Sequence, residues 1–221
     1  YLKNSEDISK DIVSKLKNHG TFRKLFTNFL NEIGYNKGGT FWDRFVVRVA
    51  PAENNLPYRE ASRINIHRDT WGTNLYQQIN WWAPVSNVEK KNTMIFYPDY
   101  FDVPVKNTTS TWDLNIYLAN RKKGDFSYPS APQLKQDLPS NIKKIPVTIK
   151  PGEILCFSGA HLHSSSKEKS ENTRISFEIR TICENDLNSS AQAPNVDCDL
   201  QWKFPKIFKK INDNSPLKIT S

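Results

Sequence analysis

Apolar positions recur at helical spacing at the start of the chain. Isoleucine, valine and leucine follow this spacing across residues 8–16, and a broader stripe rich in phenylalanine covers residues 22–33. Thr21 precedes this stripe as a plausible N-cap, and Gly34 follows it as a stop signal. The pattern predicts that residues 1–39 form helices that cover the rest of the domain.

After Gly39 the pattern changes to short apolar or alternating runs bounded by turn residues, which is typical of strands. Helices first and then strands without helical crossovers favour an antiparallel sandwich or barrel over a parallel sheet. The predicted strands cover residues 45–49, 61–67, 75–85, 93–97, 145–149, 154–157 and 174–182. We therefore expect a mainly β fold with helical cover.

Residues 98–140 interrupt this series of strands with aromatic residues set among proline, asparagine and lysine. A connection this long within a compact domain is usually functional or disordered, and the aromatic content favours order. We expect an insertion that folds over the mouth of the barrel as a lid, with a surface decoration as the alternative. Residues 40–97 and 141–183 would then form the core, and residues 184–221 a C-terminal extension, of one 221-residue domain.

Histidines are scarce, and three of the four lie in two short segments. His67 and Asp69 are two residues apart, so on an extended strand their side chains point to the same face. His161 and His163 come much later, and either would complete a set of two histidines and one carboxylate. That set leaves coordination positions open and is typical of non-haem Fe(II) oxygenases.

Arg174 lies eleven residues after His163 and offers a planar, two-pronged donor for a carboxylate. Ser176, Glu178 and Arg180 share its face of the predicted strand. A polar strand face is either exposed to solvent or part of a polar barrel interior. Beside a metal motif, we expect the interior.

Three stretches of the chain resemble one enzyme family. They are His67-Arg68-Asp69-Thr70-Trp71, Ile79-Asn80-Trp81-Trp82-Ala83-Pro84-Val85 and Phe157-Ser158-Gly159-Ala160-His161-Leu162-His163-Ser164, the last one following a Pro-Gly-acidic turn of the cupin type. Together they resemble the Fe(II)/2-oxoglutarate dioxygenases of the phytanoyl-CoA-hydroxylase-like branch, and they look closest to oxygenases of aminoglycoside (streptomycin-type) biosynthesis clusters. The resemblance implies a double-stranded β-helix (jelly-roll, cupin-type) core, with the N-terminal helices packed on one sheet.

The resemblance also implies a ligand set, in which His67, Asp69 and His163 bind Fe(II). His163 is preferred to His161 for two reasons. Its spacing to Arg174 resembles that of the branch, and it places Ser165 at the His-x-Ser position. His161 would then lie outside the first shell of the metal.

The implied co-substrates are 2-oxoglutarate and O2. Arg174 matches the arginine that pairs with the C5 carboxylate of 2-oxoglutarate, and Ser165 and Ser176 would help to hold that carboxylate. Decarboxylation to succinate would be coupled to hydroxylation of a small molecule. Halogenases of the superfamily replace the carboxylate ligand with a small residue, so Asp69 favours hydroxylation, or a related desaturation or cyclisation.

The substrate positions follow no readable code. Our candidates for substrate contact are Arg63, Trp71 and Gln78. Arg63 has the inward parity of His67 and would suit an anionic small molecule, whereas a surface or structural role is the alternative. A cationic mouth could include Arg48, Arg59, Arg63 and Arg68.

Charge and cysteine content indicate which partners and which cellular compartment to expect. The net charge is +8 and the pI about 9.3, but the lysines are scattered singly and in pairs, which is typical of a solvated surface, so we expect no nucleic-acid partner. No apolar run is long enough to cross a bilayer, so we expect no membrane partner. The three cysteines lack Cys-x-x-Cys spacing, which favours a reducing, cytoplasmic setting over a disulfide framework or a zinc ribbon.

Other function classes account for parts of the pattern. A cupin-type metal enzyme that does not use 2-oxoglutarate usually carries more histidines and has no need for Arg174. A non-catalytic basic module for nucleic acid or carbohydrate would leave the spacing of His67 and Asp69 unexplained. A nucleic-acid demethylating or repair oxygenase rests on the pI alone.

Overall fold

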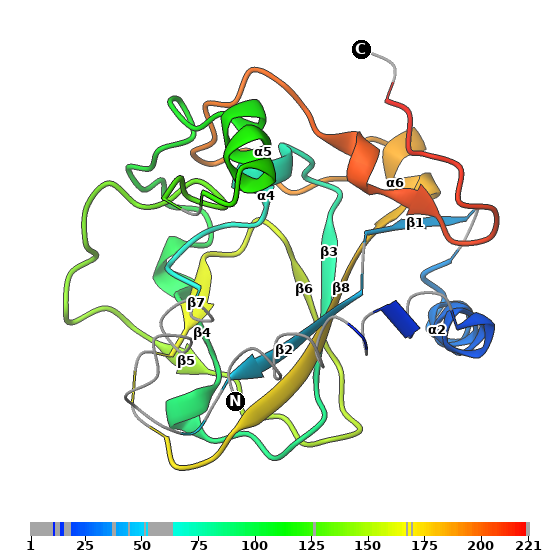
Figure 1. Ribbon diagram of the computed structural model, residues 1–221, viewed down its shortest axis with the longest axis horizontal. Helices are drawn as coiled ribbons and strands as arrows, with labels where there is room; N and C mark the ends of the chain where they lie inside the picture. Colours follow the sequence, from blue (N-terminus) through cyan, green and yellow to red (C-terminus); the bar gives the residue numbers. More distant parts are fainter. Residues whose placement is uncertain are drawn as a thin grey trace.

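The computed structural model describes residues 11, 14–15, 19–36, 39–43, 45–50, 52, 64–125, 127–166, 168 and 170–219 (Figure 1). Most of the predicted helix at residues 8–16 lies outside the described residues. The same holds for Arg59, Arg63 and the first half of the predicted strand at residues 61–67.

The first well-described element is helix α2, Gly20–Glu32, which matches the predicted apolar stripe. His19 occupies the N-cap position and Thr21 lies within the first turn, so the prediction of Thr21 as N-cap was wrong. Gly34 has a positive φ of 73°, the left-handed conformation in which glycine commonly ends a helix. Phe26 and Leu30 are buried against the sheet, and each contributes about 1.5–3 kcal/mol of hydrophobic stabilisation.

The larger of two antiparallel sheets has six strands, in the order β6-β3-β8-β1-β9, with β2 also paired to β8. Strand β8 is central because it pairs with β1, β2 and β3. The strands are β1 Thr40–Trp42, β2 Val46–Ala50, β3 Ile79–Pro84, β6 Leu155–Ser158, β8 Arg174–Cys183 and β9 Lys209–Lys210.

The smaller sheet has three antiparallel strands in the order β5-β4-β7. They are β4 Met94–Phe96, β5 Ile145–Pro146 and β7 His163–Ser165. In Figure 1 this sheet stands beside the larger one, and α2 lies on the far side of the larger sheet.

The side chains of β3 show how the strands divide the core. Trp81 packs in a cluster with Phe26 and Leu30 of α2, whereas Trp82 packs in a second cluster with Met94 and Phe96 of the smaller sheet. Alternate residues of a strand point to opposite faces, so one face of the larger sheet carries the helix and the other faces the smaller sheet.

Short helices complete the described structure: η1 Lys90–Asn92, η2 Pro98–Tyr100, η3 Pro205–Ile207, α4 Thr70–Thr73, α5 Leu114–Lys122 and α6 Glu184–Asn188. Across the described residues, no helix has the length and apolarity that a membrane span requires. The prediction of antiparallel β-sheets with helical cover is confirmed. The double-stranded β-helix and the division of the domain into segments stay predictions.

Candidate metal centre

Backbone pairing brings the two histidine segments together. His67 and His163 form an isolated antiparallel bridge, in which the amide of each donates to the carbonyl of the other at 2.9 and 3.0 Å. Directly opposed residues of an antiparallel pair project to the same face. The imidazoles therefore lie side by side, with their centroids 4.4 Å apart.

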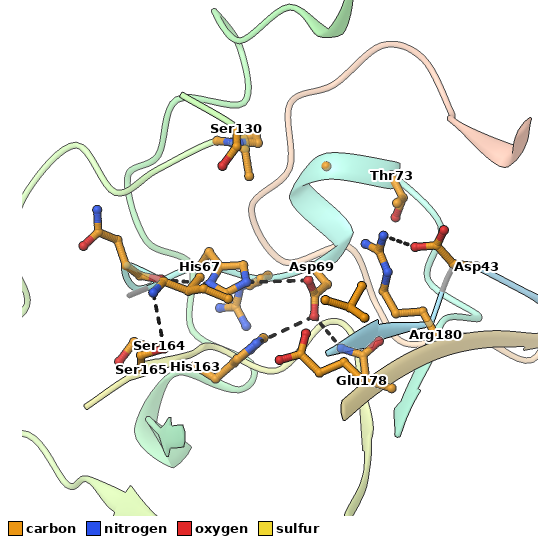
Figure 2. Close-up of a pocket in the computed structure, with 18 of the residues that line it drawn as sticks. Asp43, His67, Asp69, Thr73, Ser130, His163, Ser164, Ser165, Glu178 and Arg180 are labelled. Carbon is orange, nitrogen blue, oxygen red and sulfur yellow. Dashed lines mark hydrogen bonds and ion pairs between the residues drawn. The ribbon is translucent and has the colours of Figure 1, made fainter. Parts of the chain in front are cut away.

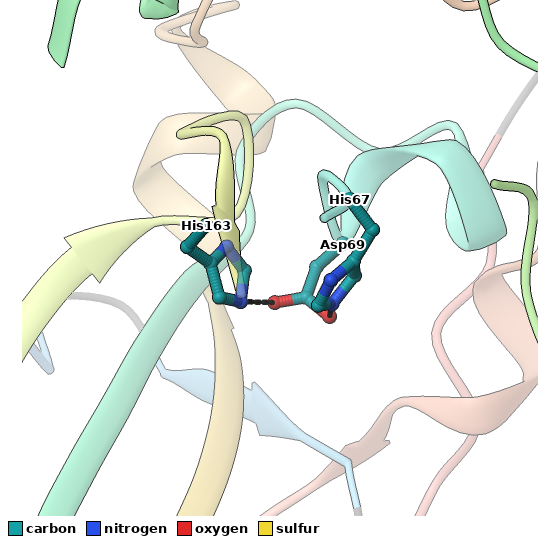
Figure 3. Close-up of side chains that lie close together, drawn as sticks. All are labelled: His67, Asp69 and His163. Atoms are coloured by element: carbon teal, nitrogen blue, oxygen red, sulfur yellow. Dashed lines mark ion pairs between the residues drawn. The ribbon is translucent and has the colours of Figure 1, made fainter. Parts of the chain in front are cut away.

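Asp69 completes the group (Figure 3). Its Oδ1 lies 3.5 Å from His67 Nε2 and its Oδ2 lies 3.7 Å from His163 Nε2. One potential ligand atom from each of the three residues lies within 4.8 Å of the other two. Two imidazoles and one carboxylate at this separation can surround a single ion.

The outer ring nitrogens of both histidines are engaged by the backbone. His67 Nδ1 lies 2.8 Å from the carbonyl oxygen of Asn65, and His163 Nδ1 lies 2.9 Å from that of His161. A carbonyl only accepts, so each Nδ1 carries the proton and each Nε2 presents its lone pair to the centre. This arrangement is typical of metal-binding histidines.

Asp69 sits at the N-terminus of α4 and is held from a second side by Asn80 of β3, whose amide donates to Oδ2. Behind Asn80, the amide of Gln78 donates to Asn80 Oδ1 at 2.9 Å. Gly159 allows this packing, because a Cβ there would lie 2.7 Å from Gln78 Nε2. Two amide side chains thus fix the carboxylate.

Protonation states in the centre suit a metal. Burial alone would raise the pKa of Asp69, but the neighbouring imidazoles of His67 and His163 and the cation of Arg180 outweigh it and hold that pKa well below its usual range. Burial, with the neighbouring His67, lowers the pKa of His163 to about 4. An ionised carboxylate and a neutral imidazole are the forms that bind divalent ions.

Arg174, at the start of β8, is a buried cation without an ion-pair partner among the described residues. Its side chain lies over the ring of Trp82, 5.7 Å from the centroid, and its Nε has no hydrogen-bond partner. The residue is 4% exposed, and burial lowers its pKa to about 10. The hydroxyl of Ser176, two residues further along β8, is buried and also lacks a partner.

Ser165 lines the same cavity, where its hydroxyl accepts the amide of Ile64 at 3.2 Å. Its own proton therefore remains to be donated. Ser165, Arg174 and the three potential metal ligands all border this cavity, which fits the predicted grouping; their roles toward a ligand stay predictions.

The cavity has a volume of about 680 Å³ and is bordered by strands of both sheets (Figure 2). This volume is typical of sites for small molecules. Arg48 pairs with Glu178, and Arg180 pairs with Asp43, along its wall. The segment that follows β4 closes another side through Trp112, Leu114, Tyr117, Leu118, Arg121, Ser130, Ala131, Pro132 and Gln133.

Several candidate residues lie elsewhere than expected. Trp71 and Gln78 are fully buried and are not among the residues that line the cavity; Trp71 donates its indole N–H to Asp197. Arg68 does not form a cationic mouth, because it is buried in an ion pair with Asp197. Arg48 is paired with the carboxylate of Glu178 and is only partly exposed.

His161 stands outside the group of three. Its ring stacks on Phe101, with the centroids 3.9 Å apart and an interplanar angle of 16°, while its carbonyl orients His163. The prediction that His163 rather than His161 faces His67 and Asp69 agrees with this geometry.

Sequence reasoning missed Asn80 and Asp43 as parts of the site. The strand parity of Asn80 was visible, but nothing local linked it to Asp69. Asp43 lies in the short connection between β1 and β2, and only the pairing of β1 with β8 brings it to Arg180. The inward position of Arg180 on its strand could have indicated Asp43, because a buried cation needs a buried carboxylate as its partner.

Fold and site together define a small β domain whose cavity holds a two-histidine, one-carboxylate group. No protein-family model matches the chain, and no curated protein sequence matches it. Solved structures resemble it at low identity. EvdO2 from Micromonospora carbonacea var. aurantiaca, solved with 2-oxoglutarate, is 10% identical over 87% of this chain and 71% of that chain, with a TM-score of 0.50.

Two further structures have lower scores. ThoJ, described as a non-haem monooxygenase, is 13% identical over 70% of this chain and 51% of its own, with a TM-score of 0.47. This chain thus spans about half the length of ThoJ. SnoK, a non-haem α-ketoglutarate-dependent carbocyclase from nogalamycin biosynthesis, is 14% identical over 88% of this chain and 73% of its own, with a TM-score of 0.48. At such identities, the likeness to EvdO2 shows a shared fold.

Proposed function

We propose that the protein is a non-haem iron oxygenase that couples decarboxylation of 2-oxoglutarate to hydroxylation of a small molecule. One observation carries the proposal: a two-histidine, one-carboxylate group shares its cavity with a buried arginine that has no anionic partner among the described residues. The first feature suits a ferrous ion with open coordination positions, and the second suits a carboxylate of its co-substrate.

The residues present fit both groups. His67, Asp69 and His163 have the donor types that Fe(II) takes, with Asp69 ionised and His163 neutral. Arg174 is desolvated and forms no ion pair with a described residue. Glu178, the carboxylate that acts on it electrostatically, is paired with Arg48, and a bound carboxylate would supply a direct partner. The partnerless hydroxyl of Ser176 lies on the same face of β8, although Ser176 is fully buried and is not among the residues that line the cavity.

The chain's own share of the reaction is binding and orientation. Bound iron and 2-oxoglutarate would supply the oxidising chemistry. Asn80 and the carbonyls of Asn65 and His161 fix the three ligands in rotation, while Arg174 would set the direction of the co-substrate. Trp82 lines the cavity and packs against Arg174.

Finer features of the proposal rest on the sequence resemblance. Asp69 occupies the position that halogenases leave free for a halide, which favours hydroxylation. The phytanoyl-CoA-hydroxylase-like branch remains our interpretation of the three motif stretches, as does the relationship to oxygenases of aminoglycoside clusters. The reducing, cytoplasmic setting likewise remains our interpretation of the cysteine spacing.

The direct test is anaerobic addition of Fe(II) and 2-oxoglutarate to the purified protein. We expect the visible charge-transfer band of the chelate, and succinate formation once air is admitted. Pools of small molecules that raise the rate of succinate formation would then identify the substrate. Metal binding without this band would favour a cupin-type enzyme that does not use 2-oxoglutarate, and no metal binding would favour a binding module.

His161→Ala is expected to leave metal affinity unchanged. The side chain of His161 stacks on Phe101, and it is the backbone carbonyl of this residue that orients His163. Titration of the apo protein with Fe(II) under anaerobic conditions measures the affinity. Loss of affinity in His161→Ala, with His163→Ala unaffected, would exchange the two histidines.

Replacing residues 113–128 with a short glycine-serine linker is expected to uncouple the reaction. This part of the predicted lid contains α5, and its flanks are joined by the hydrogen bond from Trp112 Nε1 to the carbonyl of Pro129 at 2.9 Å. Iron and co-substrate are bound by other segments, so succinate formation without substrate should persist. A substrate pool should then raise the rate of succinate formation less than it does in the parent protein, because the segment no longer confines the substrate.

Tyr117→Ala is the milder version of this change, since Tyr117 lines the cavity from α5. Both variants are compared with the parent by the ratio of product to succinate. Parental coupling in both would show that the segment is a surface decoration.

A further inference from the structure

Arg68 stands between His67 and Asp69 in sequence and carries a buried charge. Its side chain is 2% exposed and that of its partner, Asp197, is 4% exposed. The Nε of Arg68 lies 3.2 and 3.1 Å from the two carboxylate oxygens of Asp197. This is a desolvated ion pair formed across 129 positions of the chain.

The remaining guanidinium nitrogens of Arg68 donate to main-chain carbonyls. They contact the oxygens of Ala160 at 2.6 Å, Tyr100 at 2.7 Å, Val103 at 3.0 Å and Phe101 at 3.4 Å. Ala160 belongs to the turn that leads into His163, and the other three begin the segment that later lines the cavity. One side chain therefore ties the early metal-ligand turn to the late one and to the predicted lid.

Asp197 is equally saturated. Besides Arg68 it accepts the indole N–H of Trp71 at 2.7 Å and the amide of Val105 at 3.0 Å, and its carbonyl accepts the side-chain amide of Asn107 at 2.7 Å. Trp71 belongs to α4, the turn that Asp69 opens. The carboxylate of Asp197 thus contacts the turn of Asp69 through Trp71, and Arg68 is itself part of that turn.

A second set of contacts connects the Arg68 region to His163. Phe101, whose carbonyl faces Arg68, stacks its ring on that of His161, and the carbonyl of His161 accepts the Nδ1 proton of His163. Only the backbone of His161 contacts His163, so the link from Arg68 to His163 runs through the carbonyl of Ala160 and the turn that follows it, while His67 and Asp69 adjoin Arg68 in sequence.

We propose that the Arg68–Asp197 ion pair positions the ligands of the metal centre, so that tight metal binding requires the C-terminal segment around Asp197. The inference rests on the proposed function, because it presupposes that His67, Asp69 and His163 bind a divalent ion. It makes Arg68 and Asp197 positioning residues, since neither is among the ligand atoms. Displacing either partner would shift the ligand turns relative to one another.

Asp197→Asn tests this with Co(II) as a spectroscopic substitute for iron. Trp71 and Val105 donate to different oxygens of Asp197, so the variant keeps an acceptor for one of them and removes the charge that compensates Arg68. We expect Co(II) affinity to fall by about tenfold, the usual effect of removing a group that orients metal ligands. At saturating Co(II), we also expect the visible bands to shift in position, because they report ligand geometry and not the folded fraction.

Phe208→Leu is the matched control for a general loss of stability. Phe208 is fully buried in a separate cluster with Phe41, Ile182 and Leu217. Its replacement should lower the melting temperature of the apo protein while leaving Co(II) affinity and band positions unchanged. Shifts of equal size in Phe208→Leu and Asp197→Asn would overturn the inference, because the effect would then be a loss of stability alone.

Arg68→Lys keeps the charge opposite Asp197 and provides a variant that folds if Asp197→Asn does not. A single ammonium cannot contact Asp197, Ala160 and Tyr100 together, so we expect weaker Co(II) binding and shifted bands here as well. Parental affinity and bands in Arg68→Lys, or in a folded Asp197→Asn, would overturn the inference while leaving the metal centre in place. Absence of Co(II) binding by the parent would instead overturn the proposed function, and the inference with it.

Discussion

Asp69→Ala is expected to abolish tight Fe(II) binding and, with it, succinate formation from 2-oxoglutarate. Asp69 is the carboxylate of the group, and its two oxygens face the two histidine nitrogens. Its loss would remove a ligand and the negative charge that offsets the metal, so affinity should fall by more than the ten- to hundredfold typical of residues outside the first shell. Anaerobic Fe(II) titration measures the effect.

His163→Ala is the companion variant, because it removes a ligand from a different segment. Iron affinity should fall there too, whereas both variants should remain folded, since each truncates a side chain at the cavity surface. Unchanged affinity in both Asp69→Ala and His163→Ala would show that the metal site lies elsewhere.

The potential metal ligands could be predicted from sequence because their spacing encodes their geometry. His67 and Asp69 are local, so their side chains come together although the backbone is not extended as predicted: His67 lies in a β-bridge and Asp69 starts α4 in the αR conformation. His163 is distant, yet its segment has a strand pattern and a companion arginine at a fixed interval. The choice between His161 and His163 needed the family resemblance, since both have the same parity.

The surroundings of the ligands could not be predicted in the same way. In the sequence, Arg68 looks like a charged surface residue next to a site. Only the buried ion pair with Asp197, which is distant in sequence, shows that it belongs to the interior. Trp71 and Gln78 were candidates for substrate contact. In the structure they occupy the layer behind the ligands, where their hydrogen bonds hold Asp197 and Asn80.

Secondary structure was likewise predictable where the signal is local and not where it depends on distant partners. The long amphipathic stripe of α2 and the alternation of β8 were recognised because a single period runs through each. Strands β1 and β9 are only three and two residues long, which is too short to show a period in the sequence. They form because β1 pairs with β8 and β9 pairs with β1. Helix α5 has a local signal in Asp113, which caps it through two backbone amides, but its apolar face is weak.

Arg174→Ala is expected to weaken 2-oxoglutarate binding by roughly ten- to a hundredfold while leaving iron affinity unchanged. A charge-assisted hydrogen bond between a guanidinium and a carboxylate contributes about 1.5–3 kcal/mol, which corresponds to that range. The concentration of 2-oxoglutarate needed for half of the charge-transfer band measures the change. Arg174→Lys should recover only part of the affinity, because one ammonium cannot bind a carboxylate through two parallel bonds.

Stability provides an independent control for Arg174, because a binding arginine and a structural arginine respond in opposite ways. Its Nε lacks a partner and burial lowers its pKa to about 10, so the free protein retains a desolvated cation at a cost. Arg174→Met, which keeps the packing on Trp82, should therefore leave the melting temperature of the protein without 2-oxoglutarate unchanged or raise it. A marked fall in melting temperature, together with a normal charge-transfer band, would show that Arg174 serves the fold and not the co-substrate.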